Sequence, residues 1–85
     1  MKFAQDAIVL NQKAFSLEKQ AAMSLLGEKD KEPTRSILFK SAGWLAIRCG
    51  HFEGAKEMAK HGLDGTPPEE IRLELEDILR TAENA

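Results

Sequence analysis

The sequence lacks tyrosine, has one tryptophan and one cysteine, and contains no apolar run long enough to span a membrane. A single cysteine, Cys49, cannot form an intramolecular disulfide, which excludes the small secreted scaffolds that several bridges hold together. Near the amino end, Gln5, Asp6 and Asn11 interrupt the apolar residues, so this stretch fits neither a signal peptide nor a membrane-spanning helix. We therefore expect a cytoplasmic protein that does not insert into a membrane.

An excess of charge of one sign is also missing. Twelve Lys and Arg residues stand against fourteen Asp and Glu residues, which gives a net charge of −2. Non-specific nucleic-acid binding needs a basic excess that attracts phosphate over a long range, so we expect no nucleic-acid partner. Basic residues in the middle of the chain, Arg35 among them, would complement the acidic carboxyl-terminal end of another copy, although acidic helix surfaces commonly serve solubility.

The residues that are present point to one helical domain. The chain has 85 residues, of which 42% are hydrophobic and 31% charged, as in ordinary globular domains. Ala, Leu, Glu and Lys are frequent, and these residues lose little side-chain freedom in a helix. A chain of this length has room for a single core. We predict one all-α domain over residues 1–85.

Apolar residues spaced three and four apart predict a long first helix from Phe3 to Leu26, which Gly27 ends. One apolar row of this helix contains Phe3, Ala7, Leu10, Ala14, Leu17, Ala21 and Leu25. A second row beside it contains Ala4, Ile8, Phe15, Ala22 and Leu26. At about 1.5 Å per residue the helix is long for so small a domain, so part of it is expected to overhang.

Three shorter helices are predicted to follow. The charged stretch from Gly27 to Pro33 is typical of a solvated loop, and Pro33 favours the start of a second helix over Ser36 to Cys49, which Gly50 ends. A third helix is expected from Phe52 to His61.

The ends of the last two helices are also predicted from local motifs. Gly62 has the position of a glycine cap that closes the third helix, with Leu63 packing back on Met58. Thr66 and Glu69 have the spacing of a capping box, which marks the start of the fourth helix. The inward face of this fourth helix is predicted to hold Ile71, Leu75, Ile78, Leu79 and Ala82.

The second and third helices carry a recurring motif. A large apolar residue is followed four positions later by a small one, a glycine and an aromatic mark the turn, alanines line the next helix, and a proline closes about 34 residues. These residues are Phe39, Gly43, Gly50, Phe52, Ala55, Ala59 and Pro67. The pattern resembles a single tetratricopeptide (TPR)-like repeat over about Ser36 to Glu69, with departures at Ala42, Ala46 and Gly62.

This resemblance implies a four-helix TPR-like bundle: one helix-turn-helix repeat between a long amino-terminal helix and a carboxyl-terminal capping helix. A lone repeat needs neighbours to bury its apolar face, and the two flanking helices would supply them. The stretch from Arg35 to Ile71 is also similar to a group of small bacterial proteins of unassigned function, which adds no mechanism.

The resemblance also implies a binding site on the second helix. Lys40, Trp44 and Arg48 lie four residues apart and so share one line along the helix surface. In the TPR family this face lines a groove that holds peptides, which implies a non-enzymatic protein-interaction module. Two cations around an indole would suit an acidic partner or a carboxyl-terminal carboxylate. The alternative is that Trp44 packs in the core while the two cations are merely solvated.

Other candidate residues support no chemistry. Cys49 and His51 flank the Gly50 turn, but no glycine-rich oxyanion loop accompanies this thiol and imidazole, and buried cysteines commonly serve packing. His51 and His61 are ten residues apart, which is not a zinc-ligand spacing. We predict no catalytic residue, no cofactor and no metal site, and the sequence leaves open whether Cys49 is reactive.

The two apolar rows of the first helix favour an alternative function, a structural homo-oligomer. In this interpretation the long helix pairs with that of a second copy, and the dimer depends on Leu10 and Leu17. A compact monomer in which the second and third helices cover both rows is equally consistent with the sequence.

Overall fold

The computed structural model contains four helices, α1 (Lys2–Met23), α2 (Thr34–Arg48), α3 (Phe52–Leu63) and α4 (Glu69–Glu83). It describes the backbone of residues 2–85 and the side chains from residue 12 onward, and this part of the chain contains no strand. The predicted all-α class and the number and order of the helices are therefore confirmed.

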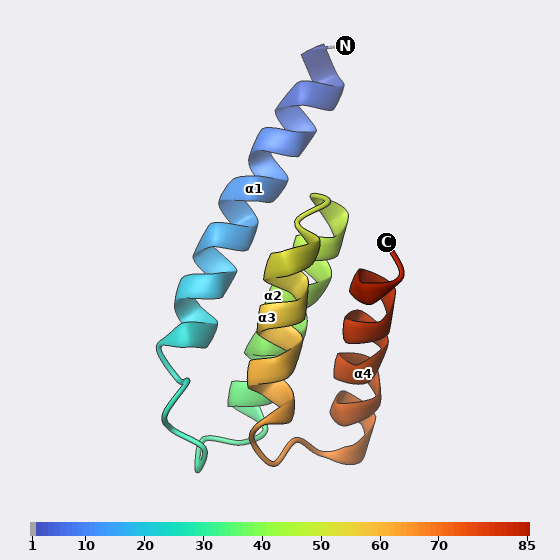
Figure 1. The fold of residues 1–85 in the computed structure, drawn as a ribbon. Helices are drawn as coiled ribbons and strands as arrows, with labels where there is room; N and C mark the ends of the chain where they lie inside the picture. Colours follow the sequence, from blue (N-terminus) through green and yellow to red (C-terminus); the bar gives the residue numbers. More distant parts are fainter. Residues whose placement is uncertain (1) are drawn as a thin grey trace.

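Successive helices run in opposite directions (Figure 1). The hairpin of α2 and α3 occupies the centre, α1 packs on α2, and α4 packs on both members of the hairpin. The first turns of α1 project beyond the ends of the other three helices (Figure 1). The molecule accordingly measures 44 × 26 × 18 Å along its principal axes, and the expected overhang of the first helix is confirmed.

All four helices contribute to one core. Its buried hydrophobic residues are Phe15, Ala22, Phe39, Ala42, Ala46, Ala55, Met58, Ala59, Leu75, Ile78 and Ala82. Small residues bring α4 close to the hairpin, because a Cβ atom at Gly43 would lie 3.1 Å from the side chain of Ile78. At Gly62 a Cβ atom would lie 2.8 Å from the side chain of Leu75. A side chain at either position would therefore require the facing side chain of α4 to shift.

The end of the first helix differs from the prediction. Helix α1 ends at Met23 rather than at Leu26. Beyond it, the N–H groups of Leu25 and Leu26 bond to carbonyls three residues back instead of four. This tighter turn leaves the carbonyls of Leu25 and Leu26 to accept from the guanidinium of Arg35, at 3.0 to 3.2 Å. A contact from a distant part of the chain therefore sets the helix end, and local propensity does not.

The predicted glycine cap of the third helix is wrong. Helix α3 continues through Gly62 to Leu63, and Asp64 is its C-cap. Among the described residues only Gly50 has a positive φ, 71°, at the turn between α2 and α3. Gly50 therefore adopts the left-handed backbone conformation that the sequence also assigned to Gly62. At Gly62 the absence of a side chain instead makes room for Leu75 of α4.

The predicted capping box of the fourth helix is also wrong. Helix α4 begins at Glu69 after Pro68, and no side chain caps its first turn. The N–H of Thr66 instead donates to Glu32 Oε2 at 3.2 Å, and Glu69 forms an ion pair with Arg72. Ion pairing and a contact across the two loops replace the local capping that the sequence favoured.

A buried polar cluster joins the α1–α2 loop to the α3–α4 loop. Arg35 is 0% exposed, and its guanidinium lies 5.1 Å above the ring of Phe39. The carbonyl oxygens that it binds carry partial negative charge and so compensate part of its positive charge. The sequence placed Arg35 among the surface cations, and the structure corrects this.

Glu32 completes this cluster. Its carboxylate accepts from the Ser36 N–H at 2.9 Å and from the Ser36 hydroxyl at 2.6 Å, in addition to the N–H of Thr66. We call Glu32, Arg35, Ser36 and Thr66 the latch. The loop that the sequence described as solvated is therefore anchored at its carboxyl end.

Candidate functional site

A hollow of about 350 Å³ lies along α2, between α1 and α4. It is lined by Glu18, Lys40, Ser41, Trp44, Leu45, Arg48 and Glu74, which together we call the groove. The three residues that the sequence singled out, Lys40, Trp44 and Arg48, all line it. Their spacing of four residues places them on the α2 face turned toward this hollow.

The sequence left open whether Trp44 packs in the core or lines a groove, and its side chain does both. Its side chain is partly buried and packs against the hydrophobic core. Another part of the same side chain lines the groove. An indole has a large apolar body and one N–H donor, so it can pack on one side and offer a contact surface on the other.

The two cations of the groove differ in their partners. Lys40 Nζ lies 3.3 Å from Glu74 Oε2, which belongs to α4. Arg48 is exposed and forms no ion pair with any side chain that the structure describes. Lys40 is therefore paired across the groove with Glu74, whereas Arg48 is the groove cation without an ionic partner among the described side chains.

Sequence reasoning missed the acidic side of the groove. Glu18 comes from α1 and Glu74 from α4, so neither shares a helix with Lys40, Trp44 and Arg48. Spacing along one helix cannot reveal residues that other helices bring alongside it. Two acids and two bases give the groove no net charge, in contrast to the purely basic surface that the sequence indicated.

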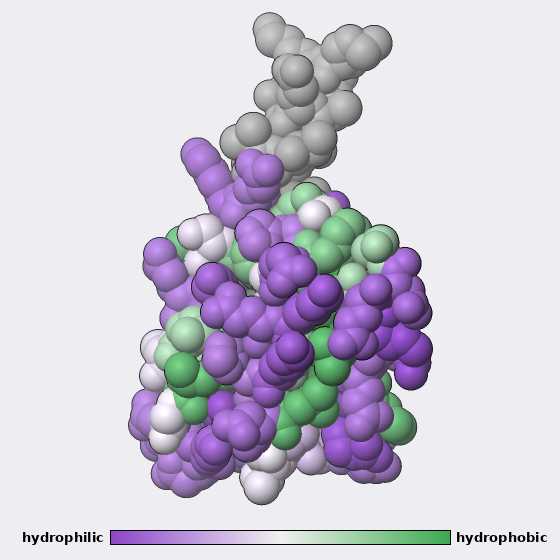
Figure 2. Space-filling model, viewed as in Figure 1, coloured by the Kyte–Doolittle hydropathy of each residue, from purple (hydrophilic) through white to green (hydrophobic). Residues whose placement is uncertain are grey.

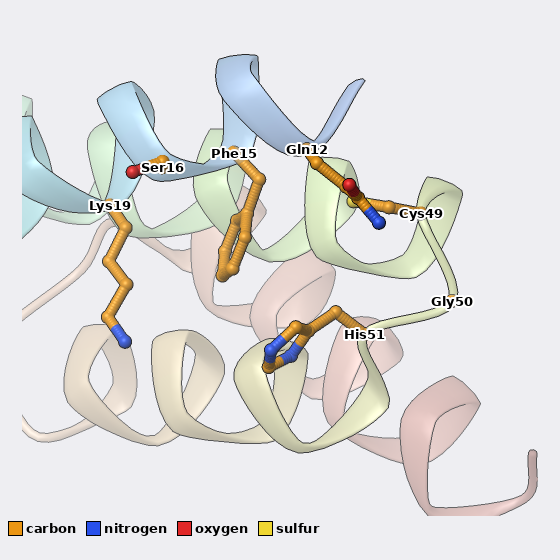
Figure 3. A pocket seen from close by; sticks show the side chains of 7 residues that line it. All are labelled: Gln12, Phe15, Ser16, Lys19, Cys49, Gly50 and His51. Carbon is orange, nitrogen blue, oxygen red and sulfur yellow. The ribbon is translucent and has the colours of Figure 1, made fainter. Parts of the chain in front are cut away.

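A second hollow, of about 430 Å³, lies between α1 and the turn after α2. Figure 3 shows its lining residues, Gln12, Phe15, Ser16, Lys19, Cys49, Gly50 and His51. The ring of Phe15 packs against that of His51, with 5.3 Å between centroids. Lys19 forms an ion pair with Glu57 of α3 at 3.2 Å.

The hydrogen bonds in this second hollow give Cys49 and His51 structural roles. His51 is the N-cap of α3, where its Nδ1 accepts from the N–H of Gly54 at 2.9 Å. The thiol of Cys49 donates to the carbonyl of Leu45 at 2.9 Å. Within the described chain, no three His, Cys, Asp or Glu residues cluster as metal ligands would.

Two exposed ion pairs near the α3–α4 connection shift carboxyl pKa values. Lys29 lies 2.9 Å from Asp64, and its hydrogen bond lowers the pKa of Asp64. Arg72 likewise lowers the pKa of Glu69 by a hydrogen bond. None of these four residues lines either hollow.

Neither the molecular surface nor the comparisons with known proteins indicate a particular function for the groove. The face in Figure 2 is mostly hydrophilic, with a strip of hydrophobic side chains between α3 and α4. Within the described residues, none of the helices has both the length and the hydrophobicity to cross a bilayer. No protein-family model matches the sequence, and neither curated proteins nor solved structures gave a match.

Proposed function

We propose that the chain is a TPR-like protein-interaction module that holds a segment of another protein in the groove and catalyses no reaction. The observation that carries this proposal is the meeting of Lys40, Trp44 and Arg48 in one hollow, where a cation that pairs with no described side chain lies on the same helix face as a partly exposed indole. Trp and Arg side chains are frequent among the residues that carry most of the binding energy of protein interfaces.

The helix arrangement supports the TPR-like part of the proposal. Helices α2 and α3 form an antiparallel pair whose turn contains Gly50 with its positive φ. Phe39, Ala55 and Ala59, which the motif places inside, are buried. Helix α1 covers one side of this pair and α4 the other, as neighbouring repeats do in longer arrays.

The chemistry of the groove favours a partner segment of mixed character. An acidic side chain or a terminal carboxylate would pair with Arg48, and an apolar neighbour would rest on Trp44. The best ligand is therefore an amphipathic peptide with an acid and an apolar residue, and not a purely acidic one.

Selection from a randomised peptide library displayed on phage, with the immobilised protein as bait, tests this proposal. The enriched peptides should carry Asp or Glu next to an apolar residue. Their affinity for the protein, measured by fluorescence anisotropy, should fall by about tenfold or more in Arg48→Glu, because a charged hydrogen bond becomes a repulsion.

Lys60→Glu is the matched control for this experiment. Lys60 is an exposed residue of α3 that does not line the groove, and its replacement changes the net charge by the same amount. The control should bind the selected peptides as the unaltered protein does. Equal losses in Arg48→Glu and Lys60→Glu, or a selection without acidic residues, would contradict groove binding.

A further inference from the structure

The two apolar rows of α1 have different surroundings in the structure. Phe15 and Ala22 of one row are buried, at 7% and 0% exposure, and face the bundle. In the other row, Leu17 is 66% exposed and Ala21 is also exposed. The compact monomer in which α2 and α3 cover both rows is therefore wrong, because Leu17 and Ala21 are left in solvent.

The exposed row follows a heptad pattern. Ala14, Leu17 and Ala21 are separated by three and then four residues, which is the spacing of the a, d and a positions of a coiled coil. The same spacing continues toward the amino end with Phe3, Ala7 and Leu10, whose side chains lie outside the described residues. Alanine thus occupies each a position, and a large residue each d position, over three heptads.

Two charged residues flank the exposed row. Lys13 precedes Ala14 at a g position, and Glu18 follows Leu17 at an e position. Neither forms an ion pair with a side chain that the structure describes. They are five positions apart, so they do not face each other on one helix, where interacting pairs lie three or four positions apart.

These flanking charges match a second copy of the same helix. In a parallel coiled coil, the g residue of one helix faces the e residue five positions further along its partner. Lys13 of each copy would then meet Glu18 of the other, and two ion pairs would form. An antiparallel pairing over the full row would instead bring the two Lys13 side chains together, which is unfavourable.

We infer that the chain forms a parallel homodimer through the outer face of α1, with Leu17 of both copies at the interface. The partner is a second copy because the row and its two charges complement themselves under a two-fold axis. Helix α1 is already folded against α2, so dimerisation does not require ordering a new helix.

The mass in solution tests the dimer. Sedimentation velocity over a concentration series should give the dimer mass for the unaltered protein, and the monomer mass for Leu17→Glu. Leu73→Glu is the matched control, since Leu73 is 51% exposed on α4 and lies outside the proposed interface. Leu73→Glu should stay dimeric. A protein that is monomeric throughout, or a dimer that Leu17→Glu leaves intact, overturns the inference.

Charge exchange tests the parallel register. Lys13→Glu should raise the dimer dissociation constant by about tenfold, because two attractions become two repulsions. The double variant Lys13→Glu and Glu18→Lys should restore the original constant. A Lys13→Glu variant that dimerises more tightly would point to the antiparallel pairing and contradict the parallel one.

Crosslinking provides a readout that does not depend on charge. In a Cys49→Ser background, Leu17→Cys should form an interchain disulfide under mild oxidation, because equivalent d positions lie side by side in a parallel pair. Leu73→Cys should stay uncrosslinked. Circular dichroism of each variant verifies that the helices remain folded, and a folded Leu17→Cys protein that does not crosslink faster than Leu73→Cys refutes the register.

Discussion

Arg35 and Arg48 are both arginines of helix α2, yet Arg35 is buried and Arg48 is exposed. Arg35 is 0% exposed, in the latch, and donates to the carbonyls of two residues of the α1–α2 connection. Arg48 is exposed at the edge of the groove without an ion pair among the described side chains. The comparison teaches that the latch uses its charges to hold the two loops together, whereas the groove leaves the charge of Arg48 exposed to solvent.

Replacing each arginine in turn by methionine should give the largest difference between the two positions in the free energy of unfolding. Arg35→Met removes the guanidinium donors of the Leu25 and Leu26 carbonyls, and should lower the free energy of unfolding by about 2–4 kcal/mol. Arg48→Met should change it by less than about 0.5 kcal/mol, because it is exposed. Urea unfolding followed by circular dichroism gives both values. Similar losses for both variants would show that Arg48 is also structural.

Glu32 of the latch and Glu74 of the groove allow the same comparison with smaller expected changes in the free energy of unfolding. Glu32→Gln weakens the bonds from Ser36 and Thr66 to the carboxylate and should cost about 1–2 kcal/mol of unfolding free energy. Glu74→Gln removes a half-exposed ion pair with Lys40 and should cost about 0–1 kcal/mol. The same urea titration measures both. A larger loss for Glu74→Gln would place the more important polar cluster at the groove.

Removing both cations of the groove should affect binding and leave stability unchanged. In Lys40→Ala with Arg48→Ala, the affinity for the selected peptides should fall by about tenfold, or about 1.4 kcal/mol. The melting temperature should not fall, since neither side chain is part of the core. Anisotropy titration and thermal melting measure the two properties. An unchanged affinity would remove the proposed site.

The smallest expected effect is a pH dependence of stability that comes from the exposed ion pair between Lys29 and Asp64. Lys29 lowers the pKa of Asp64 in the folded protein, so this pair stabilises the fold above the unfolded pKa. That contribution is lost as the pH falls through the folded pKa. The difference in melting temperature between the unaltered protein and Asp64→Asn should therefore shrink from about pH 5 to pH 2. A difference that stays constant with pH would contradict this ion pair.

The sequence predicted the helices well because their apolar spacing reflects burial directly. The inward face expected for α4 is confirmed, with Leu75, Ile78 and Ala82 buried. The ends of α1, α3 and α4 were missed for a common reason. Contacts from other parts of the chain, such as Arg35 on Leu26 and Leu75 over Gly62, decide these ends.

Only the residues of the groove that lie on α2 could be predicted from the sequence. Lys40, Trp44 and Arg48 share one helix, so their spacing of four residues was enough to place them together. Glu18 and Glu74 reach the groove from α1 and α4, and no pattern within those helices connects them to it. The burial of Arg35 was hidden as well, because a charged side chain ordinarily indicates exposure.

The most direct test of groove binding uses the only tryptophan of the chain, Trp44. Its indole N–H gives a single resonance in a ¹H–¹⁵N correlation spectrum, which can be followed while a selected peptide is added. We expect this resonance to shift with the same saturation curve as the binding isotherm, and not to shift in Arg48→Glu. A peptide that binds while the indole resonance stays in place would contradict the account.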